Sequence, residues 1–374
     1  MKKPSWLLLL ILASCSSSKL DSNSDVTISG TGRAPGGGPL SMAQVVFFKQ
    51  LDVGELLTTS LQLTASLGTV CLLRPTESGC SSVRTTTTDA QGAFSFSLKG
   101  SDTKGSVGQA STIDISVADT AQTGESFGAT TTEAFQVQVP DLKLNDLRIW
   151  HPATALAATG GNVSLTFDAF PYGTATTGVA FQSDKGVPVW SQSITSGAPI
   201  DARLLEDTQG SVMVTAQTKD PLASGGDASF YYRSGQRTYA PSASAPPSRG
   251  AGCFVHSPTG PSALSPCVLT DGDLATAFKP IPEPACSSGS CNAQADNWAY
   301  VELPASTAIS LIVVRGVTTP YLVETSGDAA AWLSSGISGG GAQSFTVSAS
   351  ARYVRVRAVT PQGRVDGLTE ISIW

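Results

Sequence analysis

The chain has 374 residues, a formal net charge of −6, only 14% charged residues, 37 glycines and 22 prolines. The negative charge argues against a nucleic-acid partner, because proteins of that class present a basic face to the phosphates. The length is too great for one small β-domain and predicts about two to four domains. Short runs rich in Val, Thr and Phe alternate with Gly, Pro, Asp and Ser, and apolar residues at helical spacing are scarce. This pattern predicts an all-β fold made of β-sandwich domains in series.

The N-terminal segment has the pattern of an export signal. Two lysines precede an apolar run over residues 6–13, and small residues lead to Cys15. A positive start, a short apolar run and small residues at a cleavage site are typical of a secretory signal peptide. A helix that crosses a bilayer needs about 20 apolar residues, so this run is too short for a membrane span. We therefore predict a signal peptide over residues 1–14 and a flexible, serine-rich tether over residues 15–25.

The tetrapeptide at the end of this signal, Leu12-Ala13-Ser14-Cys15, resembles the lipobox of bacterial lipoproteins. The resemblance implies that Cys15 is the first mature residue and carries acyl chains such as palmitate. Because one acyl chain gives only marginal membrane binding, a second or third chain makes the anchor firm. Ser16 rather than Asp follows the cysteine, and by this resemblance the expected location is the outer membrane of a bacterium. The alternative is a simple secretory signal followed by a chance cysteine.

Six cysteines remain besides Cys15, and an even number in an exported protein favours disulfides. Six cysteines allow fifteen connectivities, so pairing nearest neighbours is a hypothesis from sequence proximity. This hypothesis gives the disulfides Cys71–Cys80, Cys253–Cys267 and Cys286–Cys291. A zinc site is the alternative, but the sequence has no Cys-x-x-Cys motif and His151 and His256 are its only histidines.

Residues 26–139 predict a first β-sandwich. The segment Thr88-Asp89-x-x-Gly92 has good hairpin chemistry, because Asp bonds the turn backbone and Gly takes the left-handed position. Phe94, Phe96 and Leu98 then alternate onto one face, which should be buried. Together with the glycine-rich loop that leads to Ala43-x-Val45, this arrangement resembles the carboxypeptidase-regulatory, transthyretin-like domain. The resemblance implies a spacer or assembly module that rarely carries chemistry.

Pro140 marks an expected boundary before a second sandwich over residues 141–240. Alternating apolar residues, such as those at 163, 165 and 167, are typical of β-strands that are buried on one face. The strand spacing resembles fibronectin type III or immunoglobulin-like domains. Residues 241–252 are rich in Pro, Ser and Ala with almost no large apolar side chains, which predicts a linker stiffened by proline.

The C-terminal region, residues 253–374, contains four pieces in a fixed order: residues 270–278, residues 297–303, residues 309–317 followed by 323–328 with Trp332, and residues 351–356 followed by 368–374. These pieces and their order resemble the discoidin, or coagulation-factor type C (F5/8 type C), domain, a family that includes many carbohydrate-binding modules. The resemblance implies an eight-stranded jelly roll. Val354 and Val356 point to one side of their strand, and Arg355 to the other. We expect Trp298 and Trp332 to be core anchors rather than sugar platforms, because large aromatic residues in strands are usually packed.

The loop Asp271-Gly272-Asp273-x-x-Thr276 offers oxygen ligands for a hard cation, and its glycine permits a tight bend. In many discoidin-like modules such a loop and a glutamate of the last strand hold a structural calcium. The resemblance therefore implies calcium ligands at Asp271, Asp273, Thr276 and Glu370. The alternative is that the acidic groups cap the turn and pair with an arginine such as Arg352.

Ligands of the discoidin family bind to loops at one end of the barrel. The loop over residues 279–296 is long and proline-rich, and the disulfide expected within it would hold its shape and lower the entropy cost of binding. Aromatic rings stack on sugars, and Arg or His side chains bind hydroxyl groups. The candidate ligand-binding residues near this rim are His256, Phe278, Arg315 and Tyr321, with Phe254 beside them.

The sequence contains no nucleophile elbow, phosphate-binding loop or zinc-protease motif, so we expect no enzyme activity. We predict a lipid-anchored surface protein that binds carbohydrate through its C-terminal domain. The main alternative is a structural or assembly component of the cell envelope that binds protein partners. A third option is an accessory subunit that delivers an enzyme to a polysaccharide.

Overall fold

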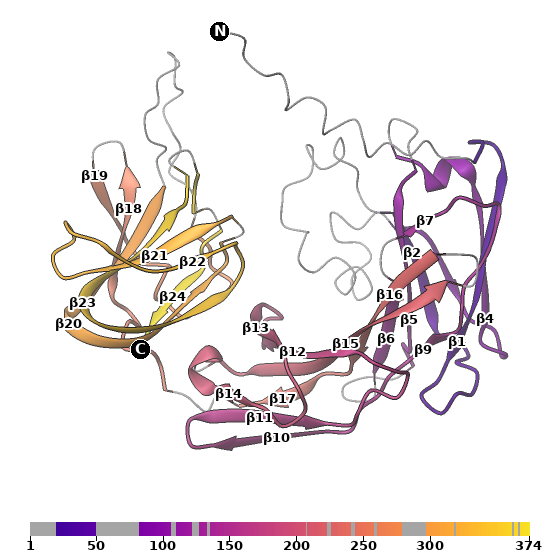
Figure 1. Ribbon diagram of the computed structural model, residues 1–374, viewed down its shortest axis with the longest axis horizontal. Helices are drawn as coiled ribbons and strands as arrows, with labels where there is room; N and C mark the ends of the chain where they lie inside the picture. Colours follow the sequence, from indigo (N-terminus) through magenta and orange to yellow (C-terminus); the bar gives the residue numbers. More distant parts are fainter. Residues whose placement is uncertain are drawn as a thin grey trace, which may run out of the picture.

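The computed structural model of the chain describes residues 20–49, 82–105, 110–121, 127–132, 135–206, 208–222, 226–240, 244–257, 260–278, 297–317, 319–360, 363–365 and 367–374 (Figure 1). The only helices in these ranges are the short 3-10 turns η1 (Gly100–Thr103) and η3 (Ala202–Leu204). The prediction of an all-β fold is therefore confirmed. Within the described ranges, no helix combines the length and the apolar character that a membrane span requires.

Two sheets contain the strands of the N-terminal region, and the larger one also contains strands of the middle region. The smaller sheet contains β4 (Ala93–Lys99), β1 (Asp25–Arg33), β8 (Asp141–Lys143) and β9 (Leu147–Arg148). The ten-stranded sheet follows the order β13 (Pro188–Ser193), β12 (Thr176–Ser183), β15 (Gly210–Leu222), β16 (Gly226–Ser234), β6 (Gly128–Thr132), β5 (Thr112–Ala118), β2 (Gln44–Lys49) and β3 (Ser82–Thr87), with β17 (Arg237–Tyr239) on β15 and β7 (Phe135–Gln136) on β5.

Two further sheets complete the fold. A three-stranded sheet contains β10 (Thr154–Thr159), β11 (Asn162–Phe167) and β14 (Pro199–Asp201). The C-terminal sheet follows the order β19 (Gly260–Leu264), β18 (Gly252–Ser257), β20 (Trp298–Arg315), β23 (Gln343–Ala358), β21 (Tyr321–Ser326) and β22 (Leu333–Ser338), with β24 (Glu370–Ile373) on β20. Figure 1 shows this sheet in orange and yellow at one end of the molecule.

The turn before β4 forms as its sequence predicts. The Asp89 carboxylate accepts hydrogen bonds from the backbone N–H groups of Gln91 and Ala93, at 2.9 and 2.8 Å. Gly92 takes a positive φ of 78°, a conformation that favours glycine. Along β4 the side chains of Phe94, Phe96 and Leu98 are buried and the residues between them are exposed, as expected from strand alternation.

The boundary predicted at Pro140 does not separate two independent sheets. Strand β8, which follows Pro140, pairs in parallel with β1 of the first region. Strand β16 of the second region pairs with β6 of the first, so one sheet runs across both predicted sandwiches. The Pro140 carbonyl accepts a 2.7 Å hydrogen bond from Thr27, so this proline leads into a strand. Pairing β6 with β16 satisfies backbone groups that a sheet edge would otherwise leave open.

The C-terminal sheet has its own apolar core, which includes Val255, Val301, Val354 and Val356. Within the described residues, the disulfide Cys253–Cys267 is present and confirms that pairing. Other predicted positions lie outside the described residues: Cys15, Cys71, Cys80, Cys286 and Cys291. The predicted linker is partly packed, because the wholly buried Ser248 accepts a hydrogen bond from the Ile373 N–H at 3.0 Å.

Candidate functional site

The structure buries three of the four candidate ligand-binding residues. Tyr321 is 0% exposed, and Phe278 and Arg315 are each 2% exposed. The Tyr321 hydroxyl donates to the Gly341 carbonyl at 3.1 Å, and burial raises the pKa of Tyr321 to about 12. Their burial means that these three side chains do not meet a ligand at the surface. His256 alone among the four is partly exposed.

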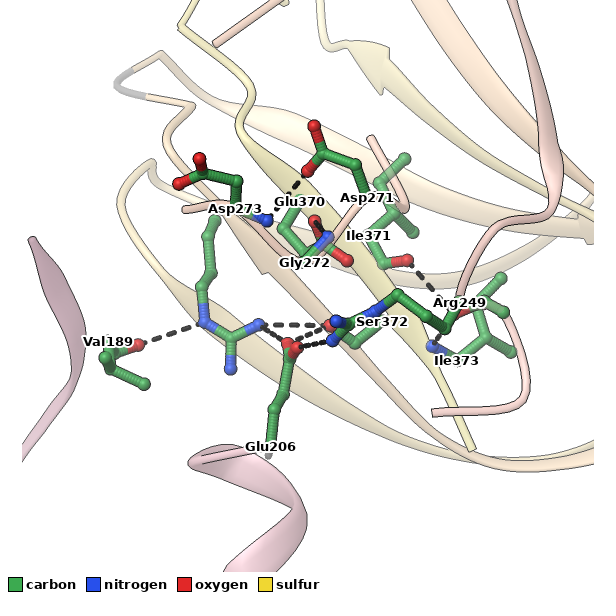
Figure 2. Close-up of polar contacts among 12 residues, drawn as sticks. Val189, Glu206, Arg249, Asp271, Gly272, Asp273, Glu370, Ile371, Ser372 and Ile373 are labelled. Carbon is green, nitrogen blue, oxygen red and sulfur yellow. Dashed lines mark hydrogen bonds and ion pairs between the residues drawn. The ribbon is translucent and has the colours of Figure 1, made fainter. Parts of the chain in front are cut away.

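Arg315 is buried because a second region of the chain covers it. Its guanidinium pairs with Glu206, which follows η3, and donates to the Leu204 carbonyl at 2.7 Å and the Val189 carbonyl at 3.0 Å. It also donates to the Ser372 hydroxyl at 3.1 Å. Figure 2 shows Glu206 and Val189 approaching the strand that carries Ser372. Arg315 therefore holds the middle region against the C-terminal sheet, and we call this contact the junction.

A second arginine completes the junction. Arg249 donates to the other Glu206 carboxylate oxygen at 2.9 Å, so two guanidinium groups neutralise one carboxylate that is wholly buried. Nearby, Lys185 of the middle region pairs with Asp273 at 2.7 Å. A buried carboxylate is stable only when it is paired and hydrogen-bonded, and Glu206 meets both conditions. Glu206 was not identified from the sequence, since its partners lie more than 40 positions away along the chain.

The proposed calcium loop forms its predicted turn, but its carboxylates bind other groups. Asp271 accepts from the Asp273 N–H at 2.8 Å and from the Thr276 hydroxyl at 2.9 Å. Asp273 accepts from the Ala275 N–H at 3.1 Å and from Lys185. These contacts cap the turn, as in the alternative interpretation, although the basic partner is Lys185. Arg352 instead pairs with Glu302 at 2.7 Å.

Glu370, the fourth expected calcium ligand, lies on β24 and is wholly buried. One of its carboxylate oxygens accepts from the Gly272 N–H at 3.3 Å, and the other has no hydrogen-bond partner. Burial, reinforced by the negative charge of Glu206, raises the pKa of Glu370 to about 8. Burial favours the neutral carboxylic acid at this position.

The four expected ligands do not converge on one point. Among the described residues, no three His, Cys, Asp or Glu side chains lie close enough together to hold a metal ion. As placed, the loop does not fit a calcium ion, and Arg249 lies directly against Gly272 of this loop. Calcium binding stays a prediction that a calcium titration monitored by melting temperature tests; an unchanged melting temperature would discard the site.

A different set of side chains gathers on the outer face of the C-terminal sheet. Strand alternation sends Ala299 and Val301 of β20 into the core and Trp298 and Tyr300 to the opposite side. The register places Phe254 of β18 directly beside Tyr300. Directly opposed residues in an antiparallel pair have Cβ atoms about 4.5–5.5 Å apart, so their rings touch.

These rings form one contiguous cluster. The Tyr300 ring centroid lies 4.9 Å from that of Phe254 and 5.4 Å from that of Trp298, with the planes within 24° of parallel. The His256 ring lies 5.3 Å from Trp298. The rings of Trp332 and Tyr353 each lie 5.9 Å from Tyr300. Tyr300 is 8% exposed and the other five side chains are partly exposed.

The expectation that Trp298 and Trp332 are core anchors is wrong, because neither belongs to the apolar core of the C-terminal sheet. Both lie on its outer side, where Trp332 packs under a cation. The Arg355 guanidinium lies 4.0 Å from the centroid of the Trp332 ring, a cation–π contact. Apolar residues alternate with aromatic ones along β20, so its sequence alone does not say which set faces inward.

Charged pairs border the aromatic cluster. Glu324 accepts from Arg355 at 2.7 Å and from Arg357 at 3.3 Å. Glu302 accepts from Arg352 at 2.7 Å and from the Tyr353 hydroxyl at 3.3 Å. Partial burial lowers the pKa of Arg355, while the bond to Glu324 opposes that effect.

The aromatic rings and the charged pairs together form one surface, which we call the aromatic face. It consists of Phe254, His256, Trp298, Tyr300, Trp332, Tyr353, Arg352, Arg355, Arg357, Glu302 and Glu324.

The structure of this chain was compared with solved structures, and its sequence with known families and curated proteins. No family model matches the chain, and no curated protein matches it in sequence. It is similar in structure to CBM32 modules. One is CpGH89CBM32-4 of Clostridium perfringens, in complex with GlcNAc-α-1,4-galactose, at 11% identity and a TM-score of 0.24, covering 34% of this chain and 91% of that chain. Another is CpGH89CBM32-5 of the same organism, in complex with GalNAc-β-1,3-galactose, at 16% identity and a TM-score of 0.24, covering 35% of this chain and 98% of that chain.

A third similar structure is the C-terminal domain of a chitobiase from Bacteroides fragilis, at 18% identity and a TM-score of 0.22, covering 32% of this chain and 87% of that chain. At these identities and TM-scores the likeness supports no argument about a ligand. A ligand can therefore be inferred only from the side chains of the aromatic face itself.

Proposed function

We propose that this protein binds carbohydrate through the aromatic face of its C-terminal sheet. The observation that supports the proposal is six contiguous rings on one sheet face, five of them partly exposed, bordered by arginine–glutamate pairs. Ligand sites combine aromatic surface with a few placed polar groups that fix orientation. The C–H faces of a sugar pack against rings, while its hydroxyls exchange hydrogen bonds with guanidinium and carboxylate groups.

The charged groups of the aromatic face are held in place before a ligand arrives. Arg355 is fixed between Glu324 and the Trp332 ring, and Arg352 is fixed by Glu302. Side chains that are already ordered lose less entropy on binding, so a preorganised face binds more tightly than a flexible one. Their unused lone pairs and N–H groups are the ones available to sugar hydroxyls.

A glycan array tests the proposal. The full chain is the right material, because a fragment over 250–374 would remove Glu206 from the buried Arg315. We expect binding by the unaltered protein and at least about fivefold weaker binding by Tyr353→Ala, since losing a stacked ring costs about 1–3 kcal/mol. Tyr231→Ala is the matched control, because Tyr231 is 43% exposed on a different sheet. The proposal fails if the protein binds no glycan, or if Tyr353→Ala binds as well as the control.

We also propose that acyl chains on Cys15 anchor this protein to the outer membrane. The support is the lipobox-like tetrapeptide ending in Cys15 and the positive, apolar segment before it. Mass spectrometry of the mature protein tests this proposal, and Cys15→Ala should move the protein from the membrane fraction to the soluble fraction. An unmodified Cys15 thiol in membrane-bound protein would reject it.

A second candidate function, binding of an envelope protein, has one feature in its favour. Leu333 and Ile337 of β22 are 72% and 65% exposed, and β22 ends the strand order of its sheet. An exposed apolar edge strand is a site where another chain can pair. Crosslinking in membranes, with Ile337→Lys as the comparison, separates the candidates. A stoichiometric partner that this variant loses would favour the protein-binding function.

A further inference from the structure

The aromatic face carries an excess of positive charge. It contains three arginines and two glutamates, and its ion pairs assign Glu302 to Arg352 while Glu324 serves both Arg355 and Arg357. This excess occurs on a chain whose overall net charge is −6. A local cationic position on an acidic protein is not a consequence of its bulk composition. With three arginines and two glutamates, one arginine of this face lacks a carboxylate of its own and is available to an anionic ligand.

The geometry identifies Arg357. Arg355 approaches Glu324 at 2.7 Å, and its guanidinium also packs on Trp332 at 4.0 Å. Arg357 reaches the same carboxylate only at 3.3 and 3.4 Å, distances at the long end for charge-assisted bonds. Its side chain is 31% exposed, against 16% for Arg355. One carboxylate that already serves a close arginine cannot also neutralise the second one.

Among the described residues, the cross-strand neighbours of Arg357 supply a ring and no further carboxylate. The strand register places Trp298 directly opposite it on β20 and Leu322 directly opposite it on β21. Beyond Trp298, the His256 ring packs at 5.3 Å. Within the part of the chain that the structure describes, Arg357 therefore has Glu324 as its acidic partner and faces an aromatic residue across the strand pair.

We propose that the aromatic face binds an acidic carbohydrate, a polysaccharide that contains uronic acid residues. This inference rests on the proposed function. The sugar ring packs against Trp298, and its carboxylate accepts hydrogen bonds from the Arg357 guanidinium. A planar guanidinium matches a carboxylate with two parallel N–H bonds, which a neutral hydroxyl cannot reproduce. Because the chain as a whole is acidic, non-specific attraction does not explain the binding of such a polymer.

The test uses polygalacturonate and hyaluronan, each beside its carboxyl-reduced, neutral form. Affinities of the full chain are measured by calorimetry at low and high salt. We expect each acidic polymer to bind about ten- to a hundredfold more tightly than its neutral form, the range for a charged hydrogen-bonded contact. Arg357→Gln should abolish this preference, so that each acidic polymer binds no more tightly than its neutral form. Arg352→Gln is the matched control and should keep the preference, because Glu302 already pairs with Arg352.

The outcomes separate this inference from the proposed function. Equal affinity for acidic and neutral forms, or an acidic preference that survives Arg357→Gln, would overturn the acidic-ligand assignment and leave carbohydrate binding intact. Stronger binding to dextran sulfate than to either uronate polymer would show that the face recognises a sulfate instead of a carboxylate. That result would also overturn the acidic-ligand assignment. Failure to bind any carbohydrate, on the array or here, would overturn both proposals.

Discussion

The junction and the aromatic face use the same pair of residue types in opposite ways. At the junction, the side chains of Arg315 and Glu206 are 3% and 0% exposed, and the arginine has four acceptors. On the aromatic face, Arg357 and its partner Glu324 are 31% and 9% exposed, and within the described residues Arg357 bonds to one acceptor group, the Glu324 carboxylate, at 3.3 and 3.4 Å. The comparison shows that the number of acceptors around an arginine, more than its position on the sheet, distinguishes a structural group from one available to a ligand.

The largest expected effect comes from breaking the junction. Arg315→Met should lower the free energy of unfolding by roughly 3–5 kcal/mol, because removing one partner leaves a buried charge incompletely paired. Lys99→Met is the control, since the Lys99–Asp25 pair is at the surface, with side chains 57% and 88% exposed, and such pairs contribute about 0–1 kcal/mol. Urea unfolding of the full chain measures both. Similar small losses for the two variants would show that the junction is not structural.

A second effect depends on pH, because burial raises the pKa of Glu370 from 4.5 to about 8. A raised pKa means that the folded state binds more protons than the unfolded state between these values, so stability falls as pH rises from about 4.5 to about 8. Each pKa unit corresponds to about 1.4 kcal/mol, which makes the loss a few kcal/mol. Glu370→Gln should flatten this part of the stability curve. An unchanged slope in Glu370→Gln would contradict this account of the buried carboxyl group.

A third effect probes the packing of the loop against the junction. Gly272 has φ of 79°, and a Cβ there would lie 1.7 Å from a nitrogen of Arg249, which binds Glu206. Gly250 has φ of 74° with nothing within 4 Å of its Cβ position. Gly250→Ala should cost about 1–2 kcal/mol for left-handed strain alone. Gly272→Ala should cost more by thermal or urea unfolding, and equal costs would show that Arg249 adapts freely.

The smallest expected effect on stability belongs to Arg357. Arg357→Gln should change the free energy of unfolding by less than about 1 kcal/mol, because the pair with Glu324 is long and partly solvated. The same variant should lose the preference for acidic polymers. A loss of stability as large as that of Arg315→Met would show that Arg357 stabilises the fold as Arg315 does. The contrast between the two regions would then not hold.

The sequence predicted the all-β class, the Asp89–Gly92 turn, the burial along β4 and the Cys253–Cys267 disulfide, because each depends on neighbouring residues. It did not predict the pairing of β6 with β16, which joins strands about 100 positions apart without a local signal. Strand pairing at that distance is decided by the packing of the whole chain.

The roles of the charged and aromatic residues were harder to predict. Arg315 was expected at an exposed rim, yet it ends a strand that is apolar on both faces. Leu311 and Val313 pack with the middle region while Ile312 and Val314 pack in the C-terminal core, and this double burial was the signal that a second region covers the strand. For the aromatic face, the period-two alternation placed the rings at Phe254 and His256, and again at Trp298 and Tyr300, on one side of each strand, but it did not say whether that side is buried.

The most direct test of the central claim follows the indole N–H resonances of the six tryptophans while a glycan that binds on the array is added to isotopically labelled full chain. Binding at the aromatic face should shift the resonances of Trp298 and Trp332 and leave that of the buried Trp150 unchanged. Trp298→Phe and Trp332→Phe assign the two signals. Saturating ligand that leaves both signals in place, or shifts only the other tryptophans, would contradict the claim that this face is the binding site.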